Sequence, residues 1–380
     1  MWVTLKLIAA SDNHFHVGPR WGECLRTHAN IVAEVERRKP DLFLLGGDFY
    51  DAESTPDERS AAAEFHQRIA NICPILHISG NHGRRRDLRI LGKLNAKHPI
   101  IIEEGAHVHY IAGAAIAAFA WPERATIAAM LGKPSSAATT DAKARELIRE
   151  MLDALGEELA AHPGPRILLG HFMIDGSSKG VGQPLIGAEL AIRLGDLALA
   201  RAHLVLAGHI HRAQHWMLGS TPVAYISAPF RTDYGDDPDV DKSMVYAEND
   251  DDGTVRWERI STQARKMHLL TGQYAHGALD VAVPADVAGS DIRVRYDVPE
   301  AEMAAGDIAA RELRARLLAA GAADVKLDPV PSVIVRVRSP EVAAQTTVEG
   351  QLRARWHLRG EPPEKQARLL DRLAKLRTPA

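Results

Sequence analysis

Seven side chains with oxygen or nitrogen donors follow short apolar runs at five places in the chain. A glycine precedes the polar residue, or pair of residues, at four of the five places. The side chains are Asp12, His14, Asp48, Asn81, His171, His209 and His211. Carboxylate, amide and imidazole donors without a thiolate suit Mn(II), Fe or Zn. Each residue alone is more easily explained as a helix cap or as a polar residue after a strand, but the five places together favour a metal site.

The chemistry expected of such a site is phosphoryl transfer. Two cations about 3.5–4 Å apart activate a water molecule and neutralise charge on a phosphate, and the single carboxylate of Asp48 can bridge them. His82 directly follows Asn81 and is free for proton chemistry. Four arginines close behind it either bind phosphate or form a solvated helix start. They are Arg84, Arg85, Arg86 and Arg89.

The elements that would position these residues alternate between strands and helices. Apolar runs at 3–10, 41–47, 74–79, 166–170 and 204–207 predict strands, and apolar periodicity at 23–38, 61–72 and 148–159 predicts helices. In open α/β sheets ligands bind at the carboxyl edge of the strands. We therefore expect all five polar segments to meet at such edges, with the glycine-rich segment 175–187 as a loop over the site.

The amino-acid composition limits the classes of protein to which this chain can belong. The 380 residues are 46% hydrophobic and 25% charged, with a net charge of −3, which predicts an ordinary globular protein of two domains, or of one large domain with an appendage. Only Cys24 and Cys73 are present, which suits a reducing cytoplasm. No stretch approaches the roughly 20 apolar residues of a membrane span, so we expect a cytoplasmic protein without a membrane segment.

The C-terminal third has a different pattern. Alternation at 292–298 and 333–337 predicts two strands, with a helix from Asp307 to Gly321 between them. Two short apolar stripes follow in the tail, which suit packing on the chain's own domain or on a partner. We predict a domain at 1–262, an α+β capping domain at 263–345 and a helical tail at 346–380. Four arginines lie on the polar face of the predicted strands, where they either meet phosphates or are solvated: Arg293, Arg295, Arg336 and Arg338.

The five polar segments, in order across residues 5 to 215, resemble the five motifs of the calcineurin-like metallophosphoesterases. They are Asp12-x-His14, Gly47-Asp48, Gly80-Asn81-His82, Gly170-His171 and Gly208-His209-x-His211. The resemblance implies a four-layer α-β-β-α core with two mixed sheets, and His82 as an unliganded acid. It implies a first metal on Asp12, His14, Asp48 and His211, and a second metal on Asp48, Asn81, His171 and His209.

Within that superfamily the chain looks most similar to the SbcD-type DNA repair nucleases. The segments that carry this resemblance are 47–51, with the sequence Gly-Asp-Phe-Tyr-Asp, and 225–235, after the last histidine motif. One departure is Gly83, where the family usually has an acidic residue. The narrower resemblance implies a Mn(II)-dependent exonuclease on duplex ends and endonuclease on single strands or hairpins. It also implies a homodimer and a partner, an SbcC-type coiled-coil ABC ATPase that the tail would contact.

Two alternatives remain open from the sequence. The same core would serve a phosphodiesterase or phosphatase for nucleotides or other small phosphoesters. A non-catalytic scaffold that bridges DNA to the ATPase, with a purely structural metal site, is the second alternative.

Overall fold

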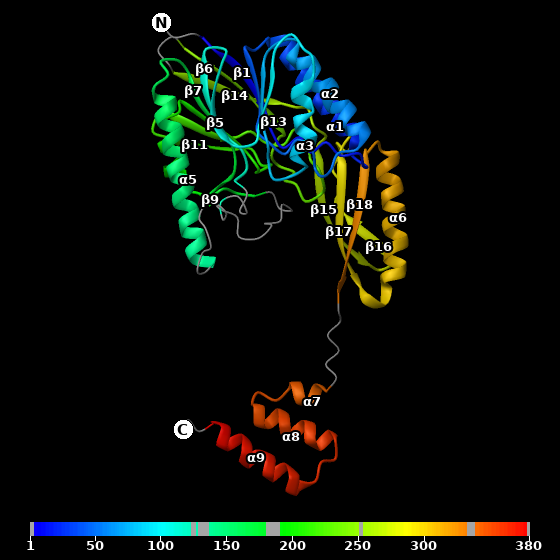
Figure 1. The fold of residues 1–380 in the computed structure, drawn as a ribbon. Helices are drawn as coiled ribbons and strands as arrows, with labels where there is room; N and C mark the ends of the chain where they lie inside the picture. The colour runs from blue at the N-terminus through cyan, green and yellow to red at the C-terminus, as the bar shows by residue number, and fades with distance from the viewer. Residues whose placement is uncertain are drawn as a thin grey trace. The chain divides into compact units, whose positions relative to one another are not determined.

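A computed structural model of the chain describes residues 4–122, 127, 137–179, 191–250, 254–332 and 339–377. Its largest elements are two six-stranded sheets with helices on their outer faces (Figure 1). In the first sheet β1 to β4 are parallel and β13 and β14 complete one edge antiparallel. The strands in spatial order are β14 (Val255–Ser261), β13 (Ser243–Asn249), β1 (Lys6–Ala10), β2 (Leu42–Leu45), β3 (Ile75–Ile78) and β4 (Ile100–Glu103).

The second sheet has four parallel central strands and an antiparallel strand at each edge. Its order is β11 (Gln214–Leu218), β12 (Thr221–Tyr225), β10 (Leu204–Gly208), β7 (Arg166–His171), β6 (Ala114–Phe119) and β5 (Ala106–Ile111). The edge strand β5 and its neighbour β6 form an antiparallel pair. Two short strands, β8 (Met173–Ile174) and β9 (Ala191–Ile192), pair separately, and a 3-10 segment, η2 (Leu194–Ala200), precedes β10.

Three apolar cores hold these layers together. Helices α1 (Trp21–Arg38) and α2 (Pro56–Ala70) pack on the first sheet, and α5 (Ala137–Ala160) packs on the second. The third core lies between the sheets, where Leu44 of β2 and Leu206 of β10 are fully buried. Parallel strands buried on both faces read as continuous apolar runs, as the four-residue strand β2 does. The predicted α-β-β-α order of layers is therefore confirmed.

Helix boundaries differ from the prediction where capping decides them. We expected the second helix from residue 61, but α2 begins at Pro56 because Thr55 and Glu58 form a reciprocal capping box. Proline at the first helical position reinforces that start. The helix expected from Asp307 begins earlier, since the 3-10 turn η3 (Glu300–Glu302) leads directly into α6 (Met303–Ala319).

A four-stranded sheet forms the α+β part of the C-terminal third. Its order is β16 (Ala278–Val281), β15 (Met267–Ala275), β17 (Asp291–Pro299) and β18 (Asp324–Ser332). The strand predicted at 333–337 lies outside the described residues, as do Arg336 and Arg338, and β18 was not predicted. The tail contains α7 (Pro340–Ala343), α8 (Val348–Leu358) and α9 (Pro363–Arg377).

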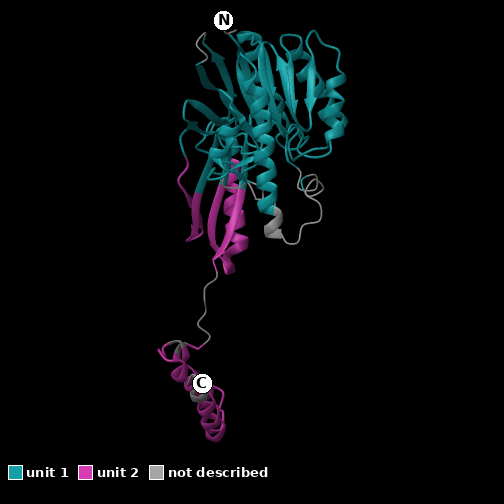
Figure 2. Cartoon of the chain, turned by 60° about the vertical axis from the view of Figure 1, so that its left-hand side comes forward, with its two compact units in different colours: residues 1–270, 284–293, 316–326 teal, residues 271–283, 294–315, 327–380 magenta. Residues whose placement is uncertain are grey.

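The internal contacts divide the chain into two compact units (Figure 2). The larger comprises residues 1–270, 284–293 and 316–326, and the smaller comprises 271–283, 294–315 and 327–380. The three-domain division at 262 and 345 stays a prediction. Within the described residues no helix is long and apolar enough to cross a membrane. Cys24 and Cys73 are buried free thiols.

Candidate metal centre

All seven predicted ligands lie at the carboxyl ends of five strands, three from the first sheet and two from the second. Asp12 and His14 follow β1, Asp48 follows β2 and Asn81 follows β3. His171 is the last residue of β7, and His209 and His211 follow β10. Backbone bonds continue the β1–β2 pairing beyond the strands, from the Asp12 amide to the Gly47 carbonyl and from the His14 amide to the Asp48 carbonyl, both at 3.0 Å. The first two motifs are therefore held as one rigid edge.

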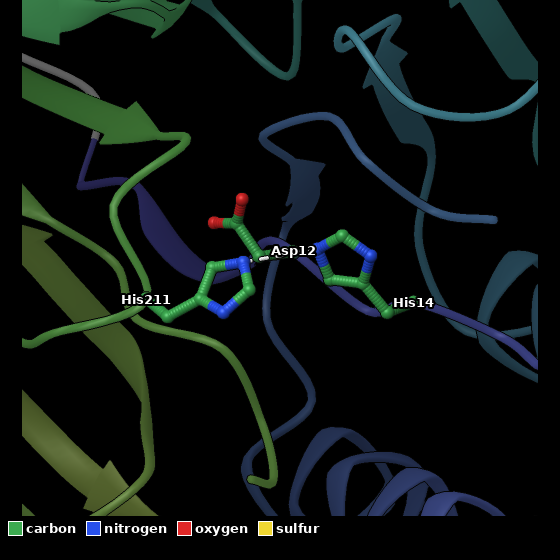
Figure 3. A group of neighbouring side chains, drawn as sticks. All are labelled: Asp12, His14 and His211. Atoms are coloured by element: carbon green, nitrogen blue, oxygen red, sulfur yellow. Dashed lines mark hydrogen bonds between the residues drawn. The ribbon is translucent and has the colours of Figure 1, made fainter. Parts of the chain in front are cut away.

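Asp12, His14 and His211 form the first group of ligands. One donor atom from each lies within 4.8 Å of the others. The two imidazole rings approach each other (Figure 3), with their Nε2 atoms 3.0 Å apart. The carboxylate of Asp12 also accepts a bond of 2.9 Å from the backbone amide of His209, which ties this group to the next one.

Asp48, His171 and His209 form the second group, again with donor atoms within 4.8 Å of one another. His171 Nε2 lies 3.2 Å from Asp48 Oδ2 and 3.0 Å from Asn81 Oδ1. His209 Nδ1 lies 3.0 Å from the same amide oxygen. The structure thus brings the seven residues into two adjacent clusters and places Asp48 with the second.

Hydrogen bonds fix the orientation of two of the imidazole rings. His171 Nδ1 donates to the carbonyl oxygen of Gly46 at 2.7 Å, and His14 Nδ1 donates to Asp51 Oδ1 at 2.9 Å. In the neutral form of each ring, this bond leaves the lone pair on Nε2, the atom that faces the other ligands. A carboxylate or carbonyl behind a histidine is the usual support of a metal-binding imidazole.

Backbone strain is concentrated at these same residues. Asp12, His14, Asp48 and His209 have φ values of 52°, 42°, 47° and 93°. Residues other than glycine rarely adopt this left-handed backbone region, and each such residue adds about 1–3 kcal/mol of strain to the folded chain. Four strained residues among seven candidates indicate that the fold holds them in place for function.

The electrostatics of the site favour positive charge. Burial lowers the pKa of His171, but the Asp48 carboxylate outweighs this effect and raises the pKa to about 9. Burial raises the pKa of Asp48, yet His171 and His14 hold it well below its ordinary value. Burial and the neighbouring His14 lower the pKa of His211. The buried Asp48 carboxylate, which stays ionised, creates a potential that attracts a cation.

His82 lies at the open side of the centre, with about a third of its side chain exposed. Its Nδ1 donates to the backbone carbonyl of Asp51 at 3.0 Å, and its backbone amide donates to Asp48 Oδ1 at 2.7 Å. Its ring lies 5.0 Å from that of His14. With Nδ1 bound to a carbonyl, Nε2 is the atom with which His82 can serve a substrate.

Two glycines, one in the third motif and one directly after it, have structural roles. A Cβ on Gly80 would lie 2.0 Å from Asp48 Oδ1, so only glycine lets the two segments approach. Gly83, the departure from the family pattern, has a φ of +72°, which glycine adopts without strain.

Three of the four predicted substrate arginines pair with acids on the surface. Arg84 and Arg86 both pair with Glu53, and Arg89 makes a bidentate pair with Glu104 at 2.6 Å. Arg85 also has a partner. Exposed pairs of this kind contribute only about 0–1 kcal/mol, so a phosphate can compete for the guanidinium groups. Their role in substrate binding stays a prediction.

Asp51 and Trp121 adjoin the centre and were not predicted as site residues. Asp51 supports His14 and lies three residues after Asp48, a spacing within the quoted motif that was available as a signal. The Trp121 ring lies 4.9 Å from that of His209, and its amide donates to the Ser79 carbonyl at 3.1 Å. No pattern in the sequence marked Trp121.

The segment at 225–235 supports His211 from behind. Ser227 Oγ and Lys242 Nζ donate to the His211 carbonyl at 3.0 and 3.2 Å. Arg231 is buried and donates to four backbone carbonyls, those of Asp237, Pro238, Val240 and Arg265. This segment therefore fixes the loop that carries the last ligand.

The family model described as calcineurin-like phosphoesterase matches residues 5–213, more than half of the chain. The chain belongs to that family. As a calcineurin-like phosphoesterase it is a hydrolase that uses divalent metal ions, and its clusters of histidine and aspartate fit a metal site. The match spans all seven candidate ligands.

Several solved structures are similar to this phosphoesterase at low identity. GAP50, the anchor in the inner membrane complex of Plasmodium, is 12% identical with a TM-score of 0.45, over 68% of this chain and 85% of that one. TT1561 of Thermus thermophilus is 15% identical with a TM-score of 0.42, over 69% and 100%. A dimetal phosphatase from Danio rerio is 10% identical with a TM-score of 0.39, over 68% and 99%. Family membership rests on the sequence match.

The donor set fits a pair of divalent cations. Asp12, His14 and His211 would hold one, and Asn81, His171 and His209 the other, with Asp48 beside the second cluster. Nitrogen and oxygen donors without sulfur suit Mn(II), Fe or Zn, and the oriented Nε2 atoms of His14 and His171 already face the other donors.

Proposed function

We propose that this phosphoesterase is a Mn(II)-dependent, two-metal DNA nuclease of the SbcD type. It would cut duplex ends exonucleolytically and single strands or hairpins endonucleolytically. Its partner would be an SbcC-type coiled-coil ABC ATPase, and it would act as a homodimer in double-strand-break repair.

The observation that carries the hydrolytic part is the convergence of seven donors from five strand ends on two adjacent clusters. Two divalent cations held there would activate water and neutralise charge on the phosphate. His82, next to both clusters, is positioned to orient the phosphate or to protonate the leaving oxygen. Asp51 and Gly46 keep the imidazoles of His14 and His171 in the required orientation.

The narrower proposal of a DNA nuclease draws support from two segments. Residues 47–51 supply Asp48 and also Asp51, which contacts both His14 and His82. Residues 225–235 supply Ser227, which donates to the His211 carbonyl, and the buried Arg231, which donates to the Asp237 carbonyl. Both segments are the ones that resemble the nuclease family, and both contact the candidate ligands or the loop that carries them.

The test is Mn(II)-dependent cleavage of blunt duplex, hairpin and circular single-stranded DNA, measured beside a chromogenic phosphodiester. The Asp48→Asn variant serves as the control without activity. Cleavage of all three DNA forms supports the proposal. Hydrolysis of the small ester with no cleavage of any DNA would support the phosphodiesterase or phosphatase instead, and metal-loaded protein inactive on every ester would support the scaffold.

The partner is tested by truncation after residue 345. We expect the truncated chain to keep its activity on the small ester and to lose binding to the ATPase, because α8 and α9 are the proposed contact. A truncated chain that binds the ATPase with full affinity would contradict this part of the proposal.

A further inference from the structure

Trp121 packs against both histidines of the second ligand group. Its indole ring lies 4.9 Å from the ring of His209 at an interplanar angle of 37°, and 5.9 Å from the ring of His171 at 73°. The two imidazole rings lie 5.4 Å apart at 71°. The three rings therefore contact one another pairwise, in tilted and edge-to-face geometries that aromatic groups prefer. An imidazole that turned away from the other ligands would lose this packing.

The backbone of Trp121 is tied to the segment that carries the third motif. Its amide donates to the carbonyl of Ser79 at 3.1 Å. Ser79 directly follows β3 and precedes Asn81 by two residues. The proline at position 122 restricts the preceding residue to extended backbone, which fixes the place from which the indole ring projects. Trp121 thus contacts two ligands through its ring and the segment of a third through its backbone.

The first ligand group is supported by other residues. Asp51 accepts a hydrogen bond from His14. Lys242 donates to the carbonyl of His211. Within the described residues, the ring of Trp121 contacts no imidazole of the first group. A change at Trp121 should therefore act on one cation site and leave the other intact.

Packing of this kind orients a ligand before a cation binds. Ligands that already have the required orientation lose less freedom on binding, and this preorganisation raises affinity. Residues that orient a ligating histidine typically account for a 10- to 100-fold change in metal affinity. We propose that Trp121 is a positioning residue that sets the affinity of the second cation site, the one on Asn81, His171 and His209. This inference rests on the two-metal centre of the proposed function.

Isothermal titration of the metal-free full chain with Mn(II) tests the proposal. The wild-type chain should bind two equivalents. Trp121→Leu removes the aromatic ring, so we expect the dissociation constant of one equivalent to rise on the order of 10-fold or more, while that of the other stays unchanged. Trp121→Phe keeps an aromatic ring against the imidazoles and should recover part of the loss.

The contrary outcomes are distinct. Equal weakening of both equivalents in Trp121→Leu, or no weakening of either, would overturn the positioning role and leave the two-metal centre standing. A wild-type chain that binds fewer than two equivalents would overturn the two-metal centre and this inference together. If Trp121→Leu does not fold, Trp121→Met, whose flexible side chain adapts to irregular space, is titrated under the same criteria.

Trp257→Leu is the matched control. Trp257 is half-buried on β14, as Trp121 is after β6, and its ring lies 5.3 Å from that of His215, which is no member of the two ligand groups. The control should bind both equivalents with wild-type affinity. A loss of affinity in Trp257→Leu equal to that in Trp121→Leu would reflect the removal of any half-buried indole and would overturn the proposal.

Turnover separates positioning from a direct catalytic role. In Trp121→Leu, the Mn(II) concentration for half-maximal hydrolysis of a chromogenic phosphodiester should rise on the order of 10-fold, with turnover at saturating Mn(II) close to that of the wild type. Low turnover at saturating Mn(II) with unchanged metal affinity would contradict the proposal.

Anomalous scattering locates the weakened site. Crystals of Trp121→Leu are soaked at a Mn(II) concentration between the two dissociation constants. A manganese peak should remain at the first ligand group and be lost at the second. Loss of the peak at the first group instead would overturn the assignment of Trp121 to the second cation.

Discussion

Asp51 accepts a hydrogen bond of 2.9 Å from Nδ1 of His14, and its backbone carbonyl accepts one of 3.0 Å from His82. A single residue thus orients a candidate ligand and the candidate acid. These two hydrogen bonds join the segment of Asp48 and Asp51 to His14 of the first motif and to His82 of the third. The candidate acid and a candidate metal ligand are therefore oriented by the same residue.

Replacing Asp51 should therefore weaken metal binding. We expect Asp51→Ala to lower Mn(II) affinity on the order of 10- to 100-fold, as loss of the carboxylate behind a ligating histidine usually does. Calorimetric titration of the metal-free chain measures this change. Glu53→Ala, which removes an exposed acid two residues away, is the control. Wild-type Mn(II) affinity in Asp51→Ala would show that the bond to His14 has no such role.

His82→Ala should separate catalysis from metal binding. The ring is no member of the two ligand clusters that hold the seven predicted ligands, so the variant should keep its Mn(II) content. Turnover of a chromogenic phosphodiester should fall on the order of 10²- to 10⁴-fold, the contribution of a positioned proton donor. His107→Ala removes a histidine that is 69% exposed on β5 and serves as the control. Undiminished turnover in His82→Ala would remove this residue from the mechanism.

Gly80→Ala should disturb the centre by a steric effect alone. The added Cβ would lie 2.0 Å from Asp48 Oδ1, so the carboxylate or the loop must move. We expect Mn(II) affinity and turnover to fall at least about tenfold, because ligand positions tolerate little displacement. Gly22→Ala, in helix α1 with no atom within 4 Å of the new Cβ, should be neutral or stabilising. Activity of Gly80→Ala equal to that of Gly22→Ala would be the contrary result.

Buried neutral histidines should make folding stability depend on pH. Burial lowers the pKa of His66 to about 4, against an ordinary value of 6.5. The unfolded chain therefore binds more protons between these values, so stability is full above pH 6.5 and falls as pH drops toward 4. His66 alone contributes up to about 3 kcal/mol to that loss. Urea unfolding of the metal-free chain at several pH values measures it.

His66→Gln isolates this contribution from those of the other histidines. Glutamine keeps a polar group near the Ala62 carbonyl and His77, the present partners at 2.8 and 3.1 Å, but does not titrate. The free energy of unfolding should fall less steeply between pH 6.5 and 4 than in the wild type. Parallel curves for the two proteins would show that His66 does not remain neutral in the folded state.

The ligands were predictable because each lies directly after a local signal. An apolar run such as 42–45, buried on both faces, can be read from composition alone, and the glycine after it marks the turn that places Asp48 at the carboxyl end of the strand. Tertiary contacts decide the residues that were missed. Trp121 reaches His209 only because β6 and β10 are both neighbours of β7 in the second sheet, a relation that no local pattern contains.

The C-terminal strands show a second limit of prediction from the sequence. In the sequence, Pro329 and Pro331 are evidence against a strand, yet β18 spans Asp324–Ser332. Proline is accepted in edge strands, where one side of the backbone needs no donor, and β18 is at the edge of its sheet. Whether a strand lies at the edge of a sheet is decided by the assembled fold. The alternation of apolar and polar residues, which we used to predict strands, does not contain this information.

Crystals of the chain soaked in MnCl2, examined for anomalous scattering at the manganese edge, test the central claim most directly. The account predicts two peaks about 3.5–4 Å apart, one on Asp12, His14 and His211, one on Asn81, His171 and His209, with Asp48 between them. Peaks absent from both clusters, or a single ion at full occupancy with the second cluster empty at millimolar Mn(II), would contradict it.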